Sequence, residues 1–350
     1  MKAAVTHGPN DMRVEEVPLP AYEPDDVLVR VEACGICGTD LHILSGAMYP
    51  LWPPRYPFIQ GHEWCGAVAA LGRNVKRGLR VGDRVIVEPT IGCKQCARCI
   101  AGQYHLCENA GKENGGYRLL GHTYNGAFSQ YGVAPPTNLH PIPDSMGWRE
   151  GVIVNQVVIA VHALDRGGRV EPADRVAVTG PGLLGLCVLE LAKHYGASRT
   201  YITGRGPRLE IARDLGVDVA IDVTKEDPVR VVMEDTGGAG VDLAIECAGT
   251  PEAVQHAVGM VRRGGRVVLE GITGGKEVPL RTDRIVLDEI SLLGARGSPN
   301  CYPRSIRLVA DGAVNARRML THEFPLEEIR RALEMFERRE GNPLRVAVRP

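Results

Sequence analysis

The chain has 350 residues, of which 44% are hydrophobic and 24% are charged, and its formal net charge is -1. This composition excludes disordered and collagen-like proteins, and the length is sufficient for two globular domains. Lysine and arginine are scattered along the chain, so we expect neither nucleic acid nor an anionic membrane as a partner. The absence of a signal-peptide core and of a long apolar run predicts a soluble, cytoplasmic protein with small-molecule ligands.

Residues 1–150 are expected to form a β-rich domain. Short apolar runs such as DVLVRVEACGICG and GDRVIVEP are separated by glycine and proline. This arrangement is typical of short strands joined by turns.

Two stretches of this region, EACGICGTDLH and IQGHEWCG, combine a thiol, two imidazoles, a carboxylate and a hydroxyl group. The residues that supply them are Cys37, Thr39, His42, His62 and Glu63. Cys37 and His62 are of the types that bind zinc well. Taken singly, each of the five residues is more often a structural residue of a core. Taken together, they favour a catalytic metal site.

The stretch GCKQCARCIAGQYHLC contains four cysteines separated by two, two and seven residues. In a reducing compartment we do not expect them to form disulfides. Four thiolates at this density suit the tetrahedral coordination of a structural zinc ion, which we favour over four unrelated buried cysteines. The sequence therefore predicts a zinc lobe at about residues 92–108 that is closed to substrate, with the ligands Cys93, Cys96, Cys99 and Cys107.

Residues 151–291 show a second pattern, in which strand, glycine turn and helix alternate. DRVAVTGPGLLGLCVLELAKHYGA is one such unit, and VDLAIECAG and GGRVVLEGI supply further strands. Alternation of this kind implies parallel strands with helical crossovers, and hence an α/β fold.

The glycines of GPGLLG follow an apolar strand directly and open a helix. In this context the motif indicates a dinucleotide-binding loop, whereas a glycine-rich turn without a ligand is the alternative. Gly180 allows a tight turn, Gly182 lets the backbone approach a pyrophosphate, and Gly185 permits close helix packing. We therefore expect a dinucleotide cofactor.

The end of the following strand, in YITGRGPR, bears on which dinucleotide is bound. NAD-binding chains place an acidic residue here to hold the ribose 2′-hydroxyl group. This chain has Gly204 instead, followed by Arg205 and, one turn later, Arg208. Because a guanidinium group can pair with a 2′-phosphate, the pattern favours NADP over NAD, and a solvated arginine loop is the alternative.

These motifs together resemble a known family. CGICGTDLH, GHEWCG, VGDRVIVEP, the four-cysteine segment and GPGLLG occur in the order and at the separations found in zinc-containing medium-chain alcohol, polyol and threonine dehydrogenases. The resemblance covers essentially the whole chain. It implies a chaperonin-10-like (GroES-like) catalytic domain at 1–150, a doubly wound Rossmann coenzyme domain at 151–291, and a return to the catalytic domain over 292–350. It also implies a homodimer or homotetramer.

The resemblance assigns roles to individual residues. It implies that Cys37 and His62 bind a catalytic zinc ion, that Glu63 is a direct or transient ligand, and that Thr39 and His42 form a proton relay. The expected cofactor-binding residues are Gly180, Gly182, Leu183, Leu184, Gly185, Gly204, Arg205, Arg208 and Cys247.

Asn155 departs from the family pattern. It lies seven residues before His162, where the family usually has a Cys, Asp or Glu ligand. An amide oxygen can coordinate zinc but is neutral, so either Asn155 is a weak ligand or Glu63 and water complete the shell. In GARGSPNCYPRSIRL, Arg296 resembles an arginine that lies near substrate in polyol dehydrogenases, and a surface arginine is the alternative.

The implied activity is hydride transfer between a secondary alcohol or polyol, or the corresponding carbonyl compound, and a nicotinamide cofactor. NADP is favoured, and two zinc ions are expected, one catalytic and one structural. Met48, Trp52 and Tyr56 either line the substrate pocket or form a packed loop. Two alternatives remain: a threonine- or glucose-dehydrogenase-like activity with NAD, and a non-catalytic module that binds nucleotide and zinc. Asn155 favours the non-catalytic module, whereas the expected relay of Thr39 and His42 argues against it.

Overall fold

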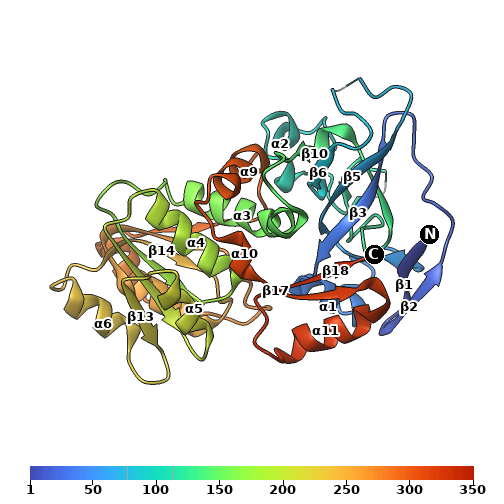
Figure 1. Ribbon diagram of the computed structural model, residues 1–350. Helices are drawn as coiled ribbons and strands as arrows, with labels where there is room; N and C mark the ends of the chain where they lie inside the picture. Colours follow the sequence, from blue (N-terminus) through green and yellow to red (C-terminus); the bar gives the residue numbers. More distant parts are fainter. Residues whose placement is uncertain (77, 113) are drawn as a thin grey trace. The chain divides into compact units, whose positions relative to one another are not determined.

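The computed structural model describes residues 1–76, 78–112 and 114–350, which form two compact units (Figure 1). The first unit comprises Met1–Asn155, Tyr302–Asp311 and Ala316–Pro350, and the second comprises Gln156–Cys301 and Gly312–Asn315. The chain therefore returns to the first unit at Tyr302 and not near Leu292. The reason is that Ser291–Gly294 still forms a strand of the second unit.

The first unit is built from short, mostly antiparallel strands. A seven-stranded sheet has the order β10-β6-β5-β3-β18-β17, with β9 also paired to β3, and β2-β1-β4 form a smaller sheet. The β-rich prediction for the first domain is confirmed. The strands are β1 (Lys2–Gly8), β2 (Asp11–Glu16), β3 (Val27–Gly35), β4 (Phe58–Ile59), β5 (Glu63–Leu71), β6 (Arg84–Val87), β7 (Thr90–Ile91), β8 (Arg118–Leu119), β9 (Tyr131–Ala134), β10 (Leu139–Pro141), β17 (Leu320–Pro325) and β18 (Arg345–Arg349).

Apolar side chains from these strands form one core, in which Trp64 and Phe128 are fully buried. Most helices of the unit are short, and they carry several of the residues discussed below. They are α1 (Gly38–Leu44), α2 (Ala97–Ile100), η1 (Tyr104–Leu106), η2 (Pro136–Asn138), α9 (Tyr302–Ala310), α10 (Ala316–Met319), η3 (Leu326–Glu328) and α11 (Ile329–Arg338). Helix α3 (Trp148–Arg166) contributes its first residues, through Asn155, to this unit.

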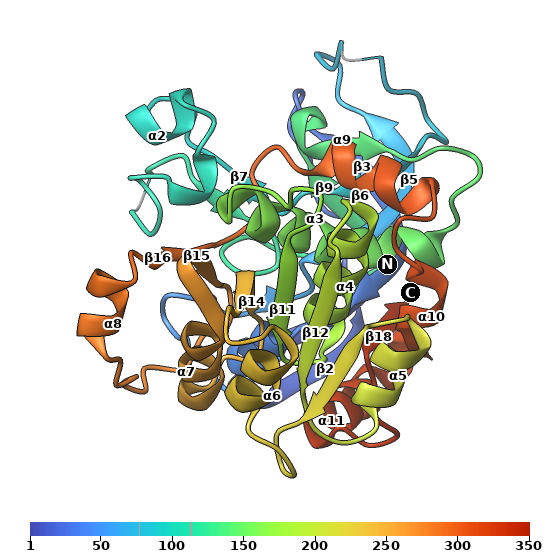
Figure 2. The same cartoon turned by 90° about the vertical axis from the view of Figure 1, so that its left-hand side faces the viewer.

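The second unit contains a six-stranded parallel sheet with the order β13-β12-β11-β14-β15-β16 (Figure 2). Helices α4 and α5 pack against β11, β12 and β13, whereas α6 and α7 pack against each other and against β13, β14 and β15. The predicted Rossmann fold is confirmed. Its elements are β11 (Arg175–Thr179), β12 (Arg199–Gly204), β13 (Val219–Asp222), β14 (Val241–Glu246), β15 (Val261–Leu269), β16 (Ser291–Gly294), α4 (Leu183–His194), α5 (Arg208–Asp214), α6 (Pro228–Asp235), α7 (Pro251–Met260) and α8 (Thr282–Leu287).

The central strands β11 and β14 are almost continuously buried, as expected for parallel strands covered on both faces. The strand order reverses between them, because β12 and β13 lie on one side of β11 while β15 and β16 lie beyond β14. Ligands of open α/β sheets bind in the crevice at the carboxyl ends of the strands at such a switch point. This rule predicts that a cofactor binds at the loops that follow β11 and β14.

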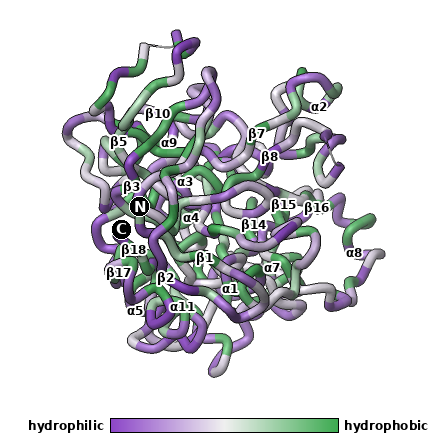
Figure 3. Tube along the Cα trace, turned by 90° about the vertical axis from the view of Figure 1, so that its right-hand side faces the viewer, coloured by the Kyte–Doolittle hydropathy of each residue, from purple (hydrophilic) through white to green (hydrophobic). Residues whose placement is uncertain are grey.

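One edge of this sheet exposes apolar side chains. β16 is the last strand, and α8 lies beside it in Figures 2 and 3; Figure 3 colours part of α8 as hydrophobic. Val286 and Leu287 on α8 are 71% and 80% exposed, and Leu292 on β16 is 36% exposed. The outer edge of a last strand, with apolar neighbours, is a surface on which a further strand can pair.

Within the part of the chain that the structure describes, no helix combines the length and the apolar character needed to cross a membrane.

Candidate active site and metal centres

Cys37, His62 and Glu63 form a compact cluster in the first unit. One ligand atom of each lies within 4.8 Å of the others. Cys37 is the N-cap of α1, whereas His62 and Glu63 lie at the start of β5, and the two segments meet because β3 pairs with β5 so that Gly35 faces Glu63. A thiolate, an imidazole and a carboxylate are the donor set of a catalytic zinc site that keeps a position open.

His62 is held by a buried acidic residue of α1. Asp40 is fully buried, and its Oδ1 lies 3.5 Å from Nδ1 of His62, while its Oδ2 accepts a hydrogen bond of 2.8 Å from the backbone N–H of Cys37. Burial alone would lower the pKa of His62, but the charges of Asp40 and Cys37 outweigh it and raise the pKa well above its usual value. Asp40 therefore faces Nδ1 and leaves Nε2 of His62 to face a metal ion, the arrangement typical of metal-binding histidines.

The carboxylate of Glu63 is shared between two basic groups. Its Oε1 lies 3.7 Å from Nε2 of His62, and its Oε2 forms an ion pair with the guanidinium group of Arg345. Arg345 is 2% exposed and also donates to the carbonyl oxygen of Ile36, which precedes Cys37. The buried arginine compensates the charge of Glu63 and holds it beside the cluster.

The predicted relay residues both lie on α1. The hydroxyl group of Thr39 is 3.8 Å from Sγ of Cys37, so it borders the cluster directly. His42 follows three residues later and is exposed, and residues three apart lie on the same side of a helix. The relay itself stays a prediction.

An aromatic side chain from the segment around residue 52 reaches the neighbourhood of the cluster. The rings of His62 and His122 are 4.3 Å apart, and Trp52 meets His122 edge-on at 4.7 Å. The same segment is tied together by the stacked rings of Tyr49 and Tyr56. The ring of His122 therefore contacts both Trp52 and the candidate metal ligand His62.

Asn155 is buried and engaged by a tyrosine. The hydroxyl group of Tyr302 donates a hydrogen bond of 3.0 Å to Oδ1 of Asn155, and Nδ2 of Asn155 has no hydrogen-bond partner among the described residues. The ring of Tyr302 stacks on His140, whose Nε2 lies 2.9 Å from Glu88, and Glu88 also accepts from the hydroxyl group of Tyr104. The oxygen through which Asn155 could bind zinc is thus fixed by a network that extends to the cysteine lobe.

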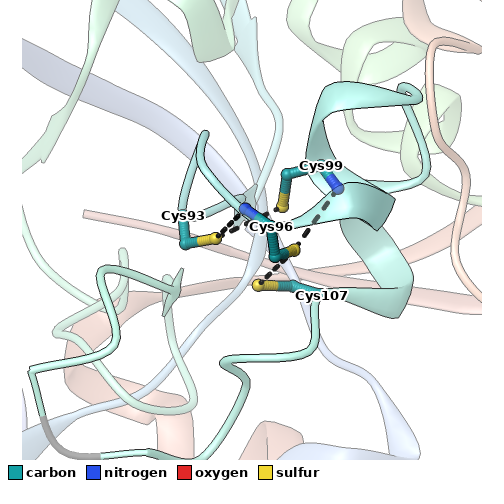
Figure 4. Close-up of side chains that lie close together, drawn as sticks. All are labelled: Cys93, Cys96, Cys99 and Cys107. Atoms are coloured by element: carbon teal, nitrogen blue, oxygen red, sulfur yellow. Dashed lines mark hydrogen bonds between the residues drawn. The ribbon is translucent and has the colours of Figure 1, made fainter.

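The four cysteines of residues 92–108 converge (Figure 4). Their sulfur atoms lie within 4.8 Å of one another, at 3.8 Å for Cys93 and Cys99 and at 3.9 Å for Cys96 and Cys107. Sulfurs bound tetrahedrally to zinc at about 2.3 Å are separated by about 3.8 Å, so these spacings fit one zinc ion. Hydrogen bonds from the backbone N–H groups of Gln95 and Cys96 lower the pKa of Cys93 to about 6, which favours a thiolate at neutral pH.

The glycine loop after β11 is shaped by close backbone contacts. Gly180 has a φ of +98°, and a Cβ atom there would lie 2.9 Å from Cβ of Ala248. A Cβ atom at Gly185 would lie 2.0 Å from the carbonyl oxygen of Gly180, whereas at Gly182 it would meet nothing closer than Arg208 at 3.9 Å. The structure therefore needs Gly180 and Gly185 for its own packing, and the space beside Gly182 is open.

The predicted cofactor-selective residues lie at the ends of β12 and α5. Arg205 follows β12 directly and is exposed, and Arg208 begins α5, with its guanidinium group near Gly182. A Cβ atom at Gly204 would lie 2.2 Å from the ring of Pro181. A side chain, acidic or otherwise, is therefore excluded from Gly204 as long as Pro181 keeps its position.

The other predicted cofactor residues also lie around this crevice. Leu183 and Leu184 form the first turn of α4, and Cys247 follows β14, where burial raises the pKa of its thiol well above the usual value. Arg296 follows β16 and is exposed. Its role near substrate stays a prediction.

Sequence reasoning missed three residues that organise the first unit: Asp40, Tyr302 and Arg345. Asp40 had a local signal, because it lies three residues after Cys37 at the start of a helix, where acidic residues cap the backbone. Tyr302 and Arg345 had none, since each meets its partner through the return of the chain to the first unit.

Comparison with known proteins identifies the family. Residues 23–144 match the alcohol dehydrogenase GroES-like domain, and residues 184–311 match the zinc-binding dehydrogenase domain. Sorbitol dehydrogenase of Bacillus subtilis (strain 168) is 34% identical over 100% of this chain and 97% of its own length. The chain belongs to the family of zinc-containing medium-chain alcohol and sorbitol dehydrogenases. It is therefore an oxidoreductase, and the expected family resemblance is confirmed.

Two further members of this dehydrogenase family extend the comparison. D-arabitol-phosphate dehydrogenase of Enterococcus avium is 34% identical over 97% of this chain and 94% of its own length. A protein of Sinorhizobium meliloti 1021, solved bound to NADP, is 31% identical, with a TM-score of 0.91 over 100% of this chain and 99% of its own.

Replacing Cys99 with Ser should remove the lobe metal. Because a structural zinc ion contributes folding free energy, we expect the zinc content to fall by about one ion per chain and the Tm to fall by about 5 °C or more. Elemental analysis and thermal unfolding measure the two effects. Cys301→Ser, at a buried cysteine outside both clusters, should keep the zinc content of the unaltered chain. An unchanged zinc content in Cys99→Ser would contradict the lobe assignment.

Two glycine variants should separate packing from ligand binding in the loop after β11. Gly185→Ala should destabilise the fold by about 2 kcal/mol, because the new methyl group meets the Gly180 carbonyl oxygen. Gly182→Ala should cost less than about 1 kcal/mol of stability yet weaken nucleotide binding about tenfold or more, because the open space there is where a pyrophosphate approaches. Chemical denaturation and nucleotide titration distinguish the two, and equal nucleotide affinity in Gly182→Ala would argue against a cofactor at this loop.

Proposed function

We propose that the chain catalyses reversible hydride transfer between a secondary alcohol or polyol and NADP. The observation that carries this proposal is the cluster of Cys37, His62 and Glu63, with the hydroxyl group of Thr39 at its border. A partly buried thiol and a buried imidazole and carboxylate, beside a hydroxyl group that can accept a proton, suit alcohol oxidation.

The residues of the cluster would hold one zinc ion, which supplies Lewis-acid chemistry that lowers the pKa of an alcohol. Thr39 would accept the proton of the substrate hydroxyl group and pass it to the exposed His42, from which it reaches solvent. The nicotinamide cofactor supplies the acceptor for the hydride from the carbon atom. Asp40 and Arg345 act by holding His62 and Glu63 in place.

The substrate class follows from the relatives and from the aromatic contact at the cluster. Relatives named for sorbitol and D-arabitol phosphate share about a third of their residues with this chain over nearly their whole length. Trp52, two rings from His62, supplies an apolar wall against which the carbon chain of a polyol or secondary alcohol can pack.

NADP is the proposed cofactor because the chain offers positive charge and no carboxylate at the end of β12. Gly204 cannot carry a side chain beside Pro181, and Arg205 is exposed directly after it. Arg208 lies near the open space at Gly182. A family member of similar fold has been solved with NADP bound. Together these observations favour a site for a 2′-phosphate group.

Two alternatives deserve comparison with this proposal. A threonine- or glucose-dehydrogenase-like activity with NAD would use the same metal cluster. A non-catalytic module that binds nucleotide and zinc is favoured by Asn155, whose oxygen is engaged by Tyr302. Thr39 beside Cys37 argues against such a module, because a site without turnover has no use for a proton relay.

We also propose that the chain forms a homo-oligomer through the β16 edge and that it works in the cytoplasm. The exposed Val286, Leu287 and Leu292 at this edge would be covered by a second copy. The cytoplasm is proposed because four cysteines lie close enough to bind one metal ion, which is typical of proteins in a reducing compartment.

The proposed activity is tested with a panel of secondary alcohols, polyols, threonine and glucose, each with NADP and with NAD. We expect reduction of the nucleotide by at least one secondary alcohol or polyol, and a loss of about a thousandfold or more in kcat for Cys37→Ser with the fold intact. Circular dichroism verifies folding, and Cys301→Ser serves as the matched control. Full turnover in Cys37→Ser would remove the metal cluster from the reaction.

Cofactor choice is tested by comparing kcat/KM for NADP and NAD. We expect NADP to be preferred, and we expect Arg205→Ala to reduce the preference roughly ten- to a hundredfold, because a charge-assisted contact is worth about 1.5 to 3 kcal/mol. Binding of NAD should change little. Arg169→Ala, at an exposed arginine before β11, removes the same charge at another place and is the matched control. A higher kcat/KM for NAD in the unaltered enzyme would refute the NADP assignment.

A further inference from the structure

One acidic residue, Glu246, joins the ends of three neighbouring strands in the second unit. It is the last residue of β14 and is fully buried. In the sheet it pairs with Thr179 of β11 on one side and with Leu269 of β15 on the other. Its contacts therefore lie at the carboxyl ends of the central strands, where open α/β sheets bind their ligands.

The carboxylate of Glu246 holds the loop that follows its own strand. Its Oε1 accepts hydrogen bonds of 2.7 Å and 2.8 Å from the backbone N–H groups of Ala248 and Gly249. The hydroxyl group of Thr179 approaches the same oxygen at 3.5 Å. Because hydrogen bonds to a charged acceptor are stronger than neutral ones, the two backbone donors fix the direction in which the chain leaves β14.

Glu246 also holds the start of the loop after β15. Its backbone carbonyl oxygen accepts hydrogen bonds of 3.0 Å and 3.1 Å from the backbone N–H groups of Glu270 and Gly271. A Cβ atom at Gly271 would lie 2.4 Å from Oε2 of Glu246 and 2.3 Å from the backbone nitrogen of Gly249. The carboxylate is thus packed between the loops after β14 and β15, and Gly271 leaves no space between them for a side chain.

The loop after β14 in turn lies against the glycine loop after β11. A Cβ atom at Gly180 would lie 2.9 Å from Cβ of Ala248 and 3.0 Å from its backbone nitrogen, so the two residues are in direct contact. The backbone N–H of Cys247 donates to the carbonyl oxygen of Thr179 at 2.9 Å and ties the same two loops together. The space available to Gly180 therefore depends on where Glu246 holds Ala248.

Asp242 makes comparable contacts at the opposite end of β14. Its Oδ2 accepts a hydrogen bond of 2.8 Å from the backbone N–H of Arg175 on β11, and its Oδ1 accepts one of 2.6 Å from Nε of Arg262 on β15. Each of these two acidic residues thus joins β14 to both of its neighbours. Because only Glu246 does so at the carboxyl ends of the strands, Asp242 is a matched reference for a purely structural role.

We propose that Glu246 is a positioning residue for the cofactor. Its carboxylate holds the loop after β14, and through Ala248 the glycine loop after β11, in the arrangement that accepts a dinucleotide. Glu246 is fully buried and acts through the backbone that it holds. The inference deepens the proposed function and rests on it, because it assumes that a dinucleotide binds at these loops.

A crevice that is held in this way binds without first having to order its loops. When the carboxylate is removed, the backbone N–H groups of Ala248 and Gly249 lose this acceptor, and the loops adopt further arrangements. The arrangement that binds nucleotide is then populated for only a fraction of the time, and the apparent affinity falls by that fraction. Loss of the carboxylate should therefore affect nucleotide binding as well as stability.

The test compares the unaltered full chain with three variants of Glu246 and with Asp242→Ala. Dissociation constants for NADPH and NADH are measured by fluorescence titration at a temperature well below the Tm of each chain. Glu246→Ala should bind both nucleotides about tenfold or more weakly. Asp242→Ala should also have a lower Tm, yet it should bind both nucleotides with the affinity of the unaltered chain.

Two conservative variants separate the reach of the side chain from its charge. Glu246→Gln should bind within about threefold of the unaltered chain, because its amide oxygen can accept the same two backbone hydrogen bonds. Glu246→Asp keeps the charge but is shorter by one methylene group, so it should bind more weakly than Glu246→Gln. Glu246→Asp also supplies the comparison with Asp242→Ala if Glu246→Ala fails to fold, as circular dichroism would show.

Hydrogen exchange without nucleotide gives an independent measure of the loops. Amide exchange at Ala248, Gly249 and Gly271 should be faster in Glu246→Ala, or in Glu246→Asp, than in the unaltered chain and in Asp242→Ala. If the folded Glu246 variants all bind nucleotide like the unaltered chain, or if Asp242→Ala weakens binding as much as they do, the inference is wrong. If the unaltered chain binds no nucleotide while the exchange rates differ as expected, Glu246 positions the loops and the proposed function fails.

Discussion

The first unit depends on one buried ion pair, between Glu63 at the start of β5 and Arg345 at the start of β18. Both residues are at most 4% exposed, so neither charge can be left unpaired without a large penalty. The pair therefore links the candidate metal cluster to the last strand of the chain. This strand also pairs with β3, whose end leads to Cys37. The return of the chain to the first unit is thus a requirement of the site as well as of the sheet.

The sequence predicted best those features that lie within a few residues of one another. The cysteines of the lobe, the glycines after β11 and the chemistry of CGICGTDLH are each local, because one turn or one helix end brings their side chains together. The fold class follows from the same local patterns, since strand, turn and helix periodicities are properties of short segments. The fold class was confirmed by the comparisons and the structure, and the structure brings the four lobe cysteines together.

The remaining contacts could not be predicted because their partners are distant in the chain. Arg345 meets Glu63, and Tyr302 meets Asn155, only once the chain has passed through the whole second unit. Glu246 ends β14 and Glu270 follows β15, but nothing in VDLAIE or RVVLE indicates that a carboxylate oxygen of each is buried. Burial of a polar group is a property of the packed molecule, and sequence pattern alone carries no record of its partner.

The close fit between Pro181 and Gly204 has a consequence for how this enzyme could change over evolution or in the laboratory. A carboxylate at position 204 is the familiar way to select a ribose hydroxyl group, yet its first carbon atom would lie 2.2 Å from the proline ring. A single substitution there would damage the loop before it altered selectivity. Any mutational path that places a carboxylate at position 204 must therefore change Pro181 first or together with Gly204, so the two positions are coupled by epistasis.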